Sequence, residues 1–391
     1  MLISWRAANR QPPSSATRFF LRILAFLLFS QPAGVLADRV SRKKILITAD
    51  VLRFALLALF PFITEVWQVY LLIFLINAVT AFFTPTFEAS IPEIVGDEQY
   101  VKALSYSRVA IDIEAVAAPA IAGLLVVWLG VRWVFWFDAA TYLVSALLVL
   151  LVAMPHVKKA VEPISFSNFI SELTVGTRII LREPSLRQAI ILSFAEALAG
   201  AAAIVATVVY IHDVLGYGDT AFALVMAGLG LGSTITAIFL GRATGRYERG
   251  VLNRETLHGR RHAWTRYSLM AGGLILGLLL LPGIFKPSIF IFGVMWFLNG
   301  AGQALIGISS STLLAEHADE AERGKAYAAH FALTHACWLI TYPAIGYAAA
   351  SFGTPLTFTF AGVGCLLITA VAFALGRGTN GLHTHERGDD V

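Results

Sequence analysis

Three carboxylates lie deep inside long apolar stretches of the sequence: Glu114, Asp138 and Glu196. None of them has a basic residue at helical spacing within its own stretch. A lone carboxylate in apolar surroundings favours its neutral form, so it can take up and release a proton near neutral pH. We therefore expect proton coupling or substrate binding at these residues, with an interhelical hydrogen bond as the alternative for each.

Two other acidic residues lie at helical spacing from an arginine. Asp50 precedes Arg53 by three residues, and Arg108 precedes Asp112 by four. Side chains at these spacings meet on one face of a helix. The spacing predicts a structural ion pair at both places.

Histidines suggest a second kind of chemistry. His330 and His335 occur in the stretch YAAHFALTHACW, and His383, His385 and Glu386 lie near the end of the chain. Neutral imidazole is a ligand for nickel, copper, zinc and iron. A spacing of five residues places His330 and His335 about 140° apart on a helix, so they share one ion only if the helix bends. Helix packing is the alternative for both.

The stretch from Asn299 to Thr312 contains Gln303, serines and glycines, and it is too polar for a lipid-facing helix. Asn299 and Gln303 are predicted to line a cavity or a flexible helix, with close helix packing as the alternative. The glycine-rich residues 228–234 are followed by no lysine, so they do not form a phosphate-binding loop and helix packing explains them. We therefore expect an ion gradient as the energy source. The sequence contains neither HExxH nor GxSxG, and we expect neither an enzyme nor a cofactor.

The elements that position these residues are membrane helices. Of the 391 residues, 57% are hydrophobic and 14% are charged, and the mean hydropathy is +0.73. Soluble proteins average about 45–50% apolar and about 25% charged residues. A helix needs roughly 20 apolar residues to cross the bilayer. Eleven such runs occur, at about 19–36, 45–64, 67–87, 105–129, 131–154, 188–211, 218–240, 267–284, 286–314, 326–350 and 355–375.

Alternate loops between these runs differ sharply in basic residues. One set of loops contains clusters such as Arg42-Lys43-Lys44, whereas the other contains only Arg132 and Lys286. Basic loops remain in the cytoplasm, so the first set and the C-terminal tail are predicted to be cytoplasmic. The same rule explains the net charge of +4 without a nucleic-acid partner. Residues 1–18 are then external, and we expect them not to span the membrane.

The first predicted cytoplasmic loop contains the most specific motif, Gly34-Val-Leu-Ala-Asp38-Arg39-Val-Ser-Arg42-Lys43-Lys44. It resembles the signature loop between the second and third helices of the major facilitator superfamily, except that Ser41 replaces the usual glycine. Gly34 permits close helix approach, and Asp38 is expected to face the positive dipole end of the next helix and to contact helix ends of the other bundle. The resemblance implies a gating motif formed by Gly34, Asp38, Arg39, Arg42 and Lys43.

An internal repeat of this motif occurs 207 residues later. The residues Gly241-Arg-Ala-Thr-Gly245-Arg246-Tyr-Glu-Arg249 follow the same pattern, with Gly245 in place of the acidic residue. This offset is half the length of a transporter with twelve helices. The resemblance implies that the eleven runs are the second to twelfth helices of the superfamily, and we expect the usual first helix to be missing.

Further stretches resemble particular branches of the superfamily. Residues 83–93 and 117–123 resemble the fourth and fifth helices of siderophore and macrolide exporters. The stretch around His330 and His335, together with the histidine-bearing C-terminus, resembles the nickel-resistance exporters. Those exporters commonly end in a richer histidine tract than this tail contains.

These features predict an all-α membrane protein with the major-facilitator fold. The expected parts are a non-spanning segment 1–18, an N-terminal bundle 19–154, a cytoplasmic linker 155–187, a C-terminal bundle 188–376 and a cytoplasmic tail 377–391. The predicted protein is a monomeric, multi-pass inner-membrane antiporter that exports a divalent metal, nickel or cobalt, in exchange for protons. Amphipathic organic compounds, drugs or siderophores, are the alternative substrates.

Overall fold

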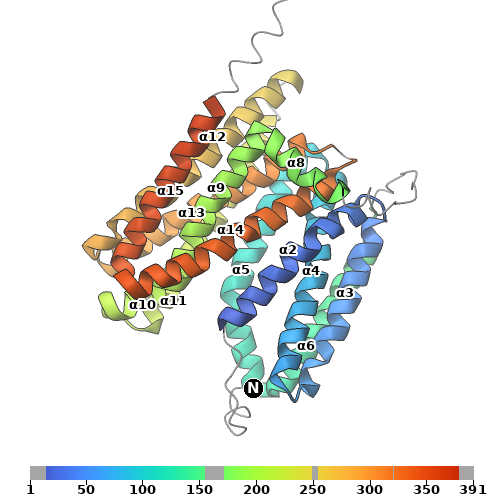
Figure 1. Cartoon of the computed structure of the whole chain (residues 1–391), viewed down its shortest axis with the longest axis horizontal. Coiled ribbons are helices and arrows are strands. Elements are labelled where there is room, and N and C mark those ends of the chain that lie inside the picture. The colour runs from blue at the N-terminus through green and yellow to red at the C-terminus, as the bar shows by residue number, and fades with distance from the viewer. Residues whose placement is uncertain (1–14, 155–170, 249–253, 320, 378–391) are drawn as a thin grey trace, which may run out of the picture. The chain divides into compact units, whose positions relative to one another are not determined.

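The computed structural model describes residues 15–154, 171–248, 254–319 and 321–377, and within these ranges it is built of helices (Figure 1). The helices up to residue 154 are α2 Ser15–Ala37, α3 Arg42–Ala58, α4 Val66–Val95, α5 Asp97–Leu129 and α6 Val131–Leu151. The later helices are α8 Val175–Arg182, α9 Pro184–Ala201, α10 Thr207–Val209, α11 Asp219–Glu248, α12 Arg254–Leu280, α13 Ile289–His317, α14 Arg323–Phe352 and α15 Thr354–Arg377. Single π-helical turns, Ala202–Ala206 and Tyr210–Val214, flank α10.

Every apolar run predicted from the sequence overlaps a helix, but the predicted count of eleven membrane-spanning helices is not confirmed. In the described residues, nine helical stretches are long and apolar enough to cross a membrane. α14 is not among them, because its histidines, threonines, tyrosines and Pro343 lower its hydropathy. Several side chains of α5 lie outside the described set, and α5 is not among the nine either.

The chain packs into two compact units, and each takes residues from several parts of the sequence. Unit 1 contains Met1–Ile94, Ala117–Arg178 and Ala318–Ala336, and unit 2 contains Val95–Val116, Ile179–His317 and Cys337–Val391. α5 and α14 therefore each contribute one part to each unit. The predicted division at a linker 155–187 stays a prediction, and residues 155–170 lie outside the described residues, as do 1–14 and 378–391.

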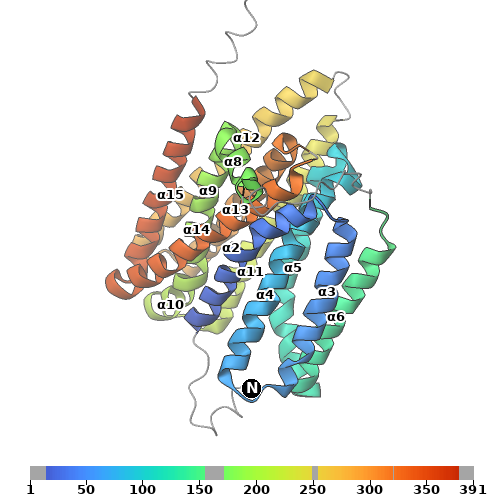
Figure 2. The same cartoon turned by 45° about the vertical axis from the view of Figure 1, so that its right-hand side comes forward.

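In unit 1, α3 and α6 lie side by side (Figures 1 and 2). Leu57, Phe60, Val69, Leu72 and Ala139 form a buried apolar cluster that joins these helices to α4. The outer face of α6 stays uncovered, with Leu147, Leu148 and Leu151 all exposed. An uncovered leucine-rich face on a helix of this length is suited to lipid.

In unit 2, α13 packs against α9, α11 and α12. A Cβ added at Gly232 of α11 would stand 1.7 Å from the Phe297 carbonyl oxygen, and one added at Gly300 of α13 would stand 1.9 Å from the Leu229 carbonyl oxygen. The backbones of α11 and α13 therefore touch directly, which small residues permit in membrane helices. This close contact confirms the prediction that residues 228–234 serve helix packing.

Candidate functional site

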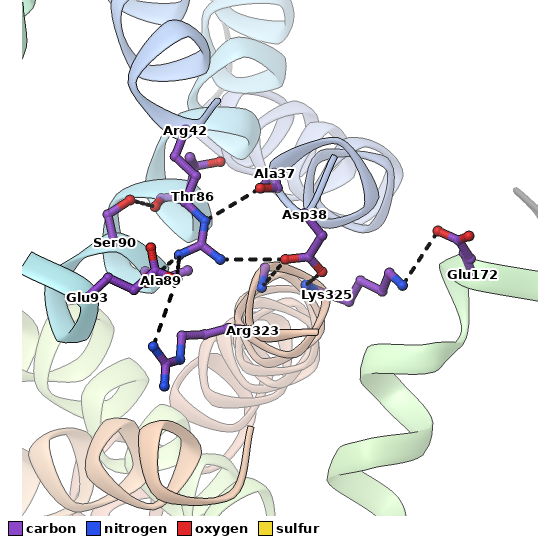
Figure 3. Close-up of polar contacts among 11 residues, drawn as sticks. Ala37, Asp38, Arg42, Thr86, Ala89, Ser90, Glu93, Glu172, Arg323 and Lys325 are labelled. Atoms are coloured by element: carbon purple, nitrogen blue, oxygen red, sulfur yellow. Dashed lines mark hydrogen bonds and ion pairs between the residues drawn. The ribbon is translucent and has the colours of Figure 1, made fainter. Parts of the chain in front are cut away.

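The loop between α2 and α3 gathers charged side chains from four parts of unit 1 (Figure 3). The other contributors are the end of α4, the start of α14 and the residues just before α8. We call this set the charge cluster. Its three carboxylates and four cations are Asp38, Glu93, Glu172, Arg39, Arg42, Arg323 and Lys325.

Asp38 is 2% exposed and follows the last residue of α2. Its carboxylate accepts hydrogen bonds from the backbone N–H groups of Gly324 at 2.8 Å and Lys325 at 3.1 Å, in the first turn of α14. Asp38 thus faces the dipole of α14, a helix within the predicted C-terminal bundle 188–376, and it contacts a helix end there as expected. The expectation that it also faces the positive end of the next helix, α3, stays a prediction. The first N–H groups of a helix have no partner inside it, so Asp38 caps α14 from a distant part of the sequence.

Arg42 is the first residue of α3, and it is buried. Its Nη1 atom lies 2.7 Å from the Ala89 carbonyl oxygen and 2.7 Å from Glu93 Oε1, both on α4. Its Nη2 atom lies 3.5 Å from Asp38 Oδ1. One guanidinium therefore ties α3 to α4 and to the carboxylate that caps α14.

Glu172 connects the residues before α8 to the same cluster. It forms an ion pair with Arg39, and its Oε2 atom lies 3.5 Å from Lys325 Nζ. Partial burial of this carboxylate opposes its ionisation, but the hydrogen bond and charge of Arg39 and the charge of Lys325 outweigh that effect. Together they hold the pKa of Glu172 below its usual value.

The lowered pKa gives Glu172 a stability contribution that depends on pH. The contribution is fully present above the pKa of a glutamate in the unfolded chain, about 4.3, and is lost as the pH falls through the lower folded pKa. We expect Glu172→Gln to lower the melting temperature at pH 7, by an amount equivalent to less than about 1 kcal/mol for a partly exposed pair. The difference in melting temperature between the variant and the parent chain should be smaller near pH 4 than at pH 7. An equal difference at both pH values would contradict the assignment.

Asp38→Asn keeps one oxygen acceptor but removes the charge that holds the first turn of α14. Hydrogen bonds to charged groups contribute about 1.5–3 kcal/mol, so weakening this cap should reduce transport about tenfold or more. Membrane insertion should be unchanged, because the apolar runs are untouched. Transport by equal amounts of membrane-inserted parent and variant measures the effect, and full transport by the variant would rule out a gating role for Asp38.

Lys43, although part of the same motif, serves a different helix. Its Nζ atom donates to the carbonyl oxygens of Leu150 at 2.7 Å and Val152 at 2.8 Å, at the C-terminal end of α6. A cation at this end complements the unpaired carbonyls and the helix dipole. The structure therefore does not bring Lys43 together with Asp38 and Arg42.

The two copies of the repeated motif place their first glycine in similar surroundings. A Cβ added at Gly34 would stand 2.6 Å from Ala328 Cβ in the early turns of α14. A Cβ added at Gly241 would stand 2.7 Å from Ser105 Oγ in the early turns of α5. In each unit, the motif glycine allows the end of one helix to approach the beginning of another.

The three carboxylates selected from the sequence, Glu114, Asp138 and Glu196, have different surroundings. Glu114 and Asp138 are exposed in the described structure. Glu196 is half-buried on α9. The sequence predicted that Glu196 is isolated within its own helix, but Arg108 of α5 lies close enough for its charge to act on Glu196. A coupling or substrate role for each of the three stays a prediction.

Both ion pairs expected from helical spacing are confirmed. Arg53 Nη2 lies 2.6 Å from Asp50 Oδ1, and its guanidinium carbon lies 3.9 Å from the centre of the Phe83 ring. Arg108 Nε lies 3.4 Å from Asp112 Oδ1. The Arg108 pair also involves α11, because Arg108 Nε donates to Ser233 Oγ at 2.7 Å and Thr234 Oγ1 donates to Asp112 Oδ2 at 3.1 Å.

One of the two helical histidines, His335, lies among aromatic side chains. The ring of His335 is 4.7 Å from that of Phe26 and 4.1 Å from that of Phe331, and its Nδ1 atom lies 2.7 Å from the Phe331 carbonyl oxygen. Within the part of the chain that the structure describes, no three histidine, cysteine or acidic side chains gather as a metal site. The His-bearing residues 383–386 lie outside that part.

Asn299 and Gln303 are both buried on α13, and Gln303 Nε2 donates to Asn299 Oδ1 at 2.8 Å. Their predicted role in lining a cavity stays a prediction.

Sequence reasoning missed Glu93, Glu172, Arg323 and Lys325 as members of the charge cluster. Their types gave no signal of their own, since each lies at a helix end where charged residues are common. It also missed Glu88 of α4, which is half-buried within the candidate span Val66–Val95 and has no hydrogen bond or ion pair with a described residue. The rule that selected Glu196, an ionisable residue in an apolar run, did not select Glu88 because the predicted run ended at residue 87.

Comparison with known proteins gives a family match. The family model described as Major Facilitator Superfamily matches residues 11–257 and 257–388. Macrolide efflux protein A of Enterococcus faecalis is 32% identical over 171 residues, which are 42% of this chain and 53% of that protein. The matched stretch thus spans about half the length of this relative.

Two longer similarities support the fold. The Bacillus subtilis protein described as uncharacterized MFS-type transporter YfiS is 24% identical over 357 residues, 88% of this chain and 80% of that protein. The crystal structure of the human organic anion transporter MFSD10 (TETRAN) superposes with a TM-score of 0.72 at 14% identity, over 91% of this chain and 82% of that chain. The architecture of the chain is therefore the all-helical major-facilitator fold.

Proposed function

Because the chain belongs to the Major Facilitator Superfamily, a family of membrane transporters, we propose that it exports amphipathic organic compounds in exchange for protons. The similarity to macrolide efflux proteins supports this substrate class over the metal ions preferred from the sequence. An inner-membrane location and action as a monomer belong to the same proposal.

The observation that carries the mechanism is the cap that Asp38 forms on the first turn of α14. Alternating access requires contacts that form in one state of a transporter and break in another. A cap made of charge-assisted hydrogen bonds is strong enough to favour one state, yet it can be exchanged for water when the helix end becomes hydrated. Arg42 and Glu93 hold the carboxylate in place for that purpose. The motif loop is thus proposed to gate the predicted cytoplasmic side.

Proton exchange is assigned to carboxylates within the spans. Glu196 is the first candidate, since it is half-buried and faces one arginine. Glu114, Asp138 and Glu88 are the others. Burial disfavours the charged form of a carboxylate, so a partly covered group changes protonation state more readily when water or substrate reaches it.

Nickel or cobalt export requires several ligands of suitable type around one ion. His330 and His335 are the proposed ligands in that case, but no third histidine, cysteine or acidic group joins them in the described residues. Organic compounds are therefore the better-supported substrates.

A growth experiment separates these substrate classes. Cells that express the chain and cells with an empty vector are challenged in parallel with a macrolide, a siderophore, nickel and cobalt. We expect expression to raise tolerance to at least one of the two organic compounds and to leave metal tolerance unchanged. Tolerance raised only toward nickel or cobalt would overturn the proposal in favour of metal export. Unchanged tolerance to all four compounds would overturn the proposal that the chain is an exporter of any of them.

A further inference from the structure

Gly307 of α13 lies beside two opposite charges in unit 2. A Cβ added at this residue would stand 3.7 Å from Glu196 Oε1 and 3.8 Å from Arg108 Nη1. Apart from neighbouring atoms of α13 itself, no other described atom would lie within 4 Å of it. The carboxylate from α9 and the guanidinium from α5 therefore flank the same space.

Arg108 and Glu196 form no direct ion pair in the described structure. Arg108 is held from its other side, where its Nε atom donates to Ser233 Oγ at 2.7 Å and lies 3.4 Å from Asp112 Oδ1. No described residue accepts a hydrogen bond from Arg108 Nη1 or donates one to Glu196. The two groups are thus fixed near each other, and each retains hydrogen-bonding capacity on the side of Gly307.

The size and chemistry of the space restrict what it can bind. A Cβ at Gly307 would be in ordinary contact with both charged groups, so Glu196 Oε1 and Arg108 Nη1 lie at most about 7.5 Å apart. An oxygen between these two atoms, outside van der Waals contact with the Gly307 Cα, would lie at hydrogen-bond distance from both, about 2.7–3.2 Å, if each side chain moved by about 1 Å or less. Because a guanidinium only donates and an ionised carboxylate only accepts, a bridging oxygen must both accept and donate. Water and hydroxyl groups do both, whereas carbonyl and ether oxygens do not.

We propose that Arg108, Glu196 and the space beside Gly307 form a binding site for one hydroxyl oxygen, supplied by water or by a hydroxyl group of the substrate. Two titratable groups interact electrostatically with Glu196: Arg108 from α5 and the Cys337 thiol from α14. Asp112 compensates the charge of Arg108. Only the identity of the substrate rests on the proposed function. The bridge itself exists whether or not the chain transports organic compounds.

The test uses Gly307→Ala in the full chain. The added methyl group makes ordinary contact with both charged groups, so packing of α13 is preserved while a bridging oxygen is excluded. Gly293→Ala, on the same helix, is the matched control, because a Cβ there meets nothing within 4 Å. The infrared carboxyl or carboxylate band of Glu196 is identified as the band that Glu196→Gln removes. We expect this band to shift in Gly307→Ala and to stay unchanged in Gly293→Ala; identical spectra for the two alanine variants would overturn the site.

A second measurement distinguishes the source of the oxygen. Equilibrium exchange of a labelled macrolide is measured in proteoliposomes with the same two variants. If a substrate hydroxyl occupies the site, Gly307→Ala slows exchange about tenfold relative to Gly293→Ala, which corresponds to about 1.4 kcal/mol. If water occupies it, exchange is unchanged and the infrared shift remains. Should the parent chain exchange no macrolide, the proposed substrate fails while the infrared result still decides the site.

Discussion

Replacing Arg42 by alanine is expected to lower the free energy of unfolding by about 3–5 kcal/mol and to abolish transport. The reason is the position of the guanidinium, which is buried between two carboxylates. Its loss leaves Glu93 without the partner at 2.7 Å and removes the contact with Asp38 at 3.5 Å. Breaking a buried ion pair by removing one member costs more than the pair contributes, because the remaining charge stays buried. Unfolding in mixed detergent micelles and transport in proteoliposomes provide the two readouts.

Lys44→Ala is the matched control for Arg42→Ala. Lys44 lies two residues further along α3, carries the same charge and is exposed. Its removal should change stability by about 0.5 kcal/mol or less, as is usual for exposed positions. Equal losses of stability in the two variants would show that positive charge alone matters and that the buried contacts of Arg42 do not.

Glu196→Gln is expected to remove accumulation driven by a pH gradient while leaving equilibrium exchange measurable. Glutamine keeps the size of the side chain but cannot take up and release a proton. Coupling free energies between two ligands are typically about 1–3 kcal/mol. The factor by which the pH gradient raises accumulation should therefore be about ten times smaller in the variant than in the parent chain. Transport into proteoliposomes, with and without an imposed pH gradient, measures the difference.

The other carboxylates supply the comparison for this experiment. Glu114→Gln and Asp138→Asn alter exposed side chains, so they are expected to respond more like the parent chain. Glu88→Gln tests the carboxylate that the sequence did not indicate. If Glu196→Gln responds to the gradient like the parent chain, Glu196 is not the coupling residue. A loss of gradient-driven accumulation in one of the other variants would then assign proton coupling to the residue that this variant changes.

The fold follows from the sequence because its two strongest signals are physical constraints. Apolar runs of membrane length must be helical, since lipid offers no partner to a free backbone group. The repeated motif at Gly34 and Gly241 then indicates two related halves, and both glycines mark close helix approaches. Local spacing was equally reliable for Asp50–Arg53 and Arg108–Asp112, which form the pairs that a helix dictates.

The site was predicted less completely, because its contacts join residues far apart in the chain. Asp38 caps a helix that begins 285 residues later, at Arg323, and helical periodicity carries no information about such a distance. Lys43 stands next to Arg42 in the motif, yet it turns to the end of α6. An apolar run also does not reveal which face other helices cover, so the exposure of Glu114 and Asp138 could not be read from the sequence.

Macrolide uptake into inside-out membrane vesicles most directly tests the proposal that this chain exports organic compounds in exchange for protons. In such vesicles an exporter moves its substrate inward, and protons leave through the same protein. We predict that vesicles containing the chain accumulate labelled macrolide when their interior is acidic, and that a protonophore abolishes the accumulation. Uptake no greater than in vesicles without the chain, or accumulation that persists after the gradient is collapsed, would contradict the account.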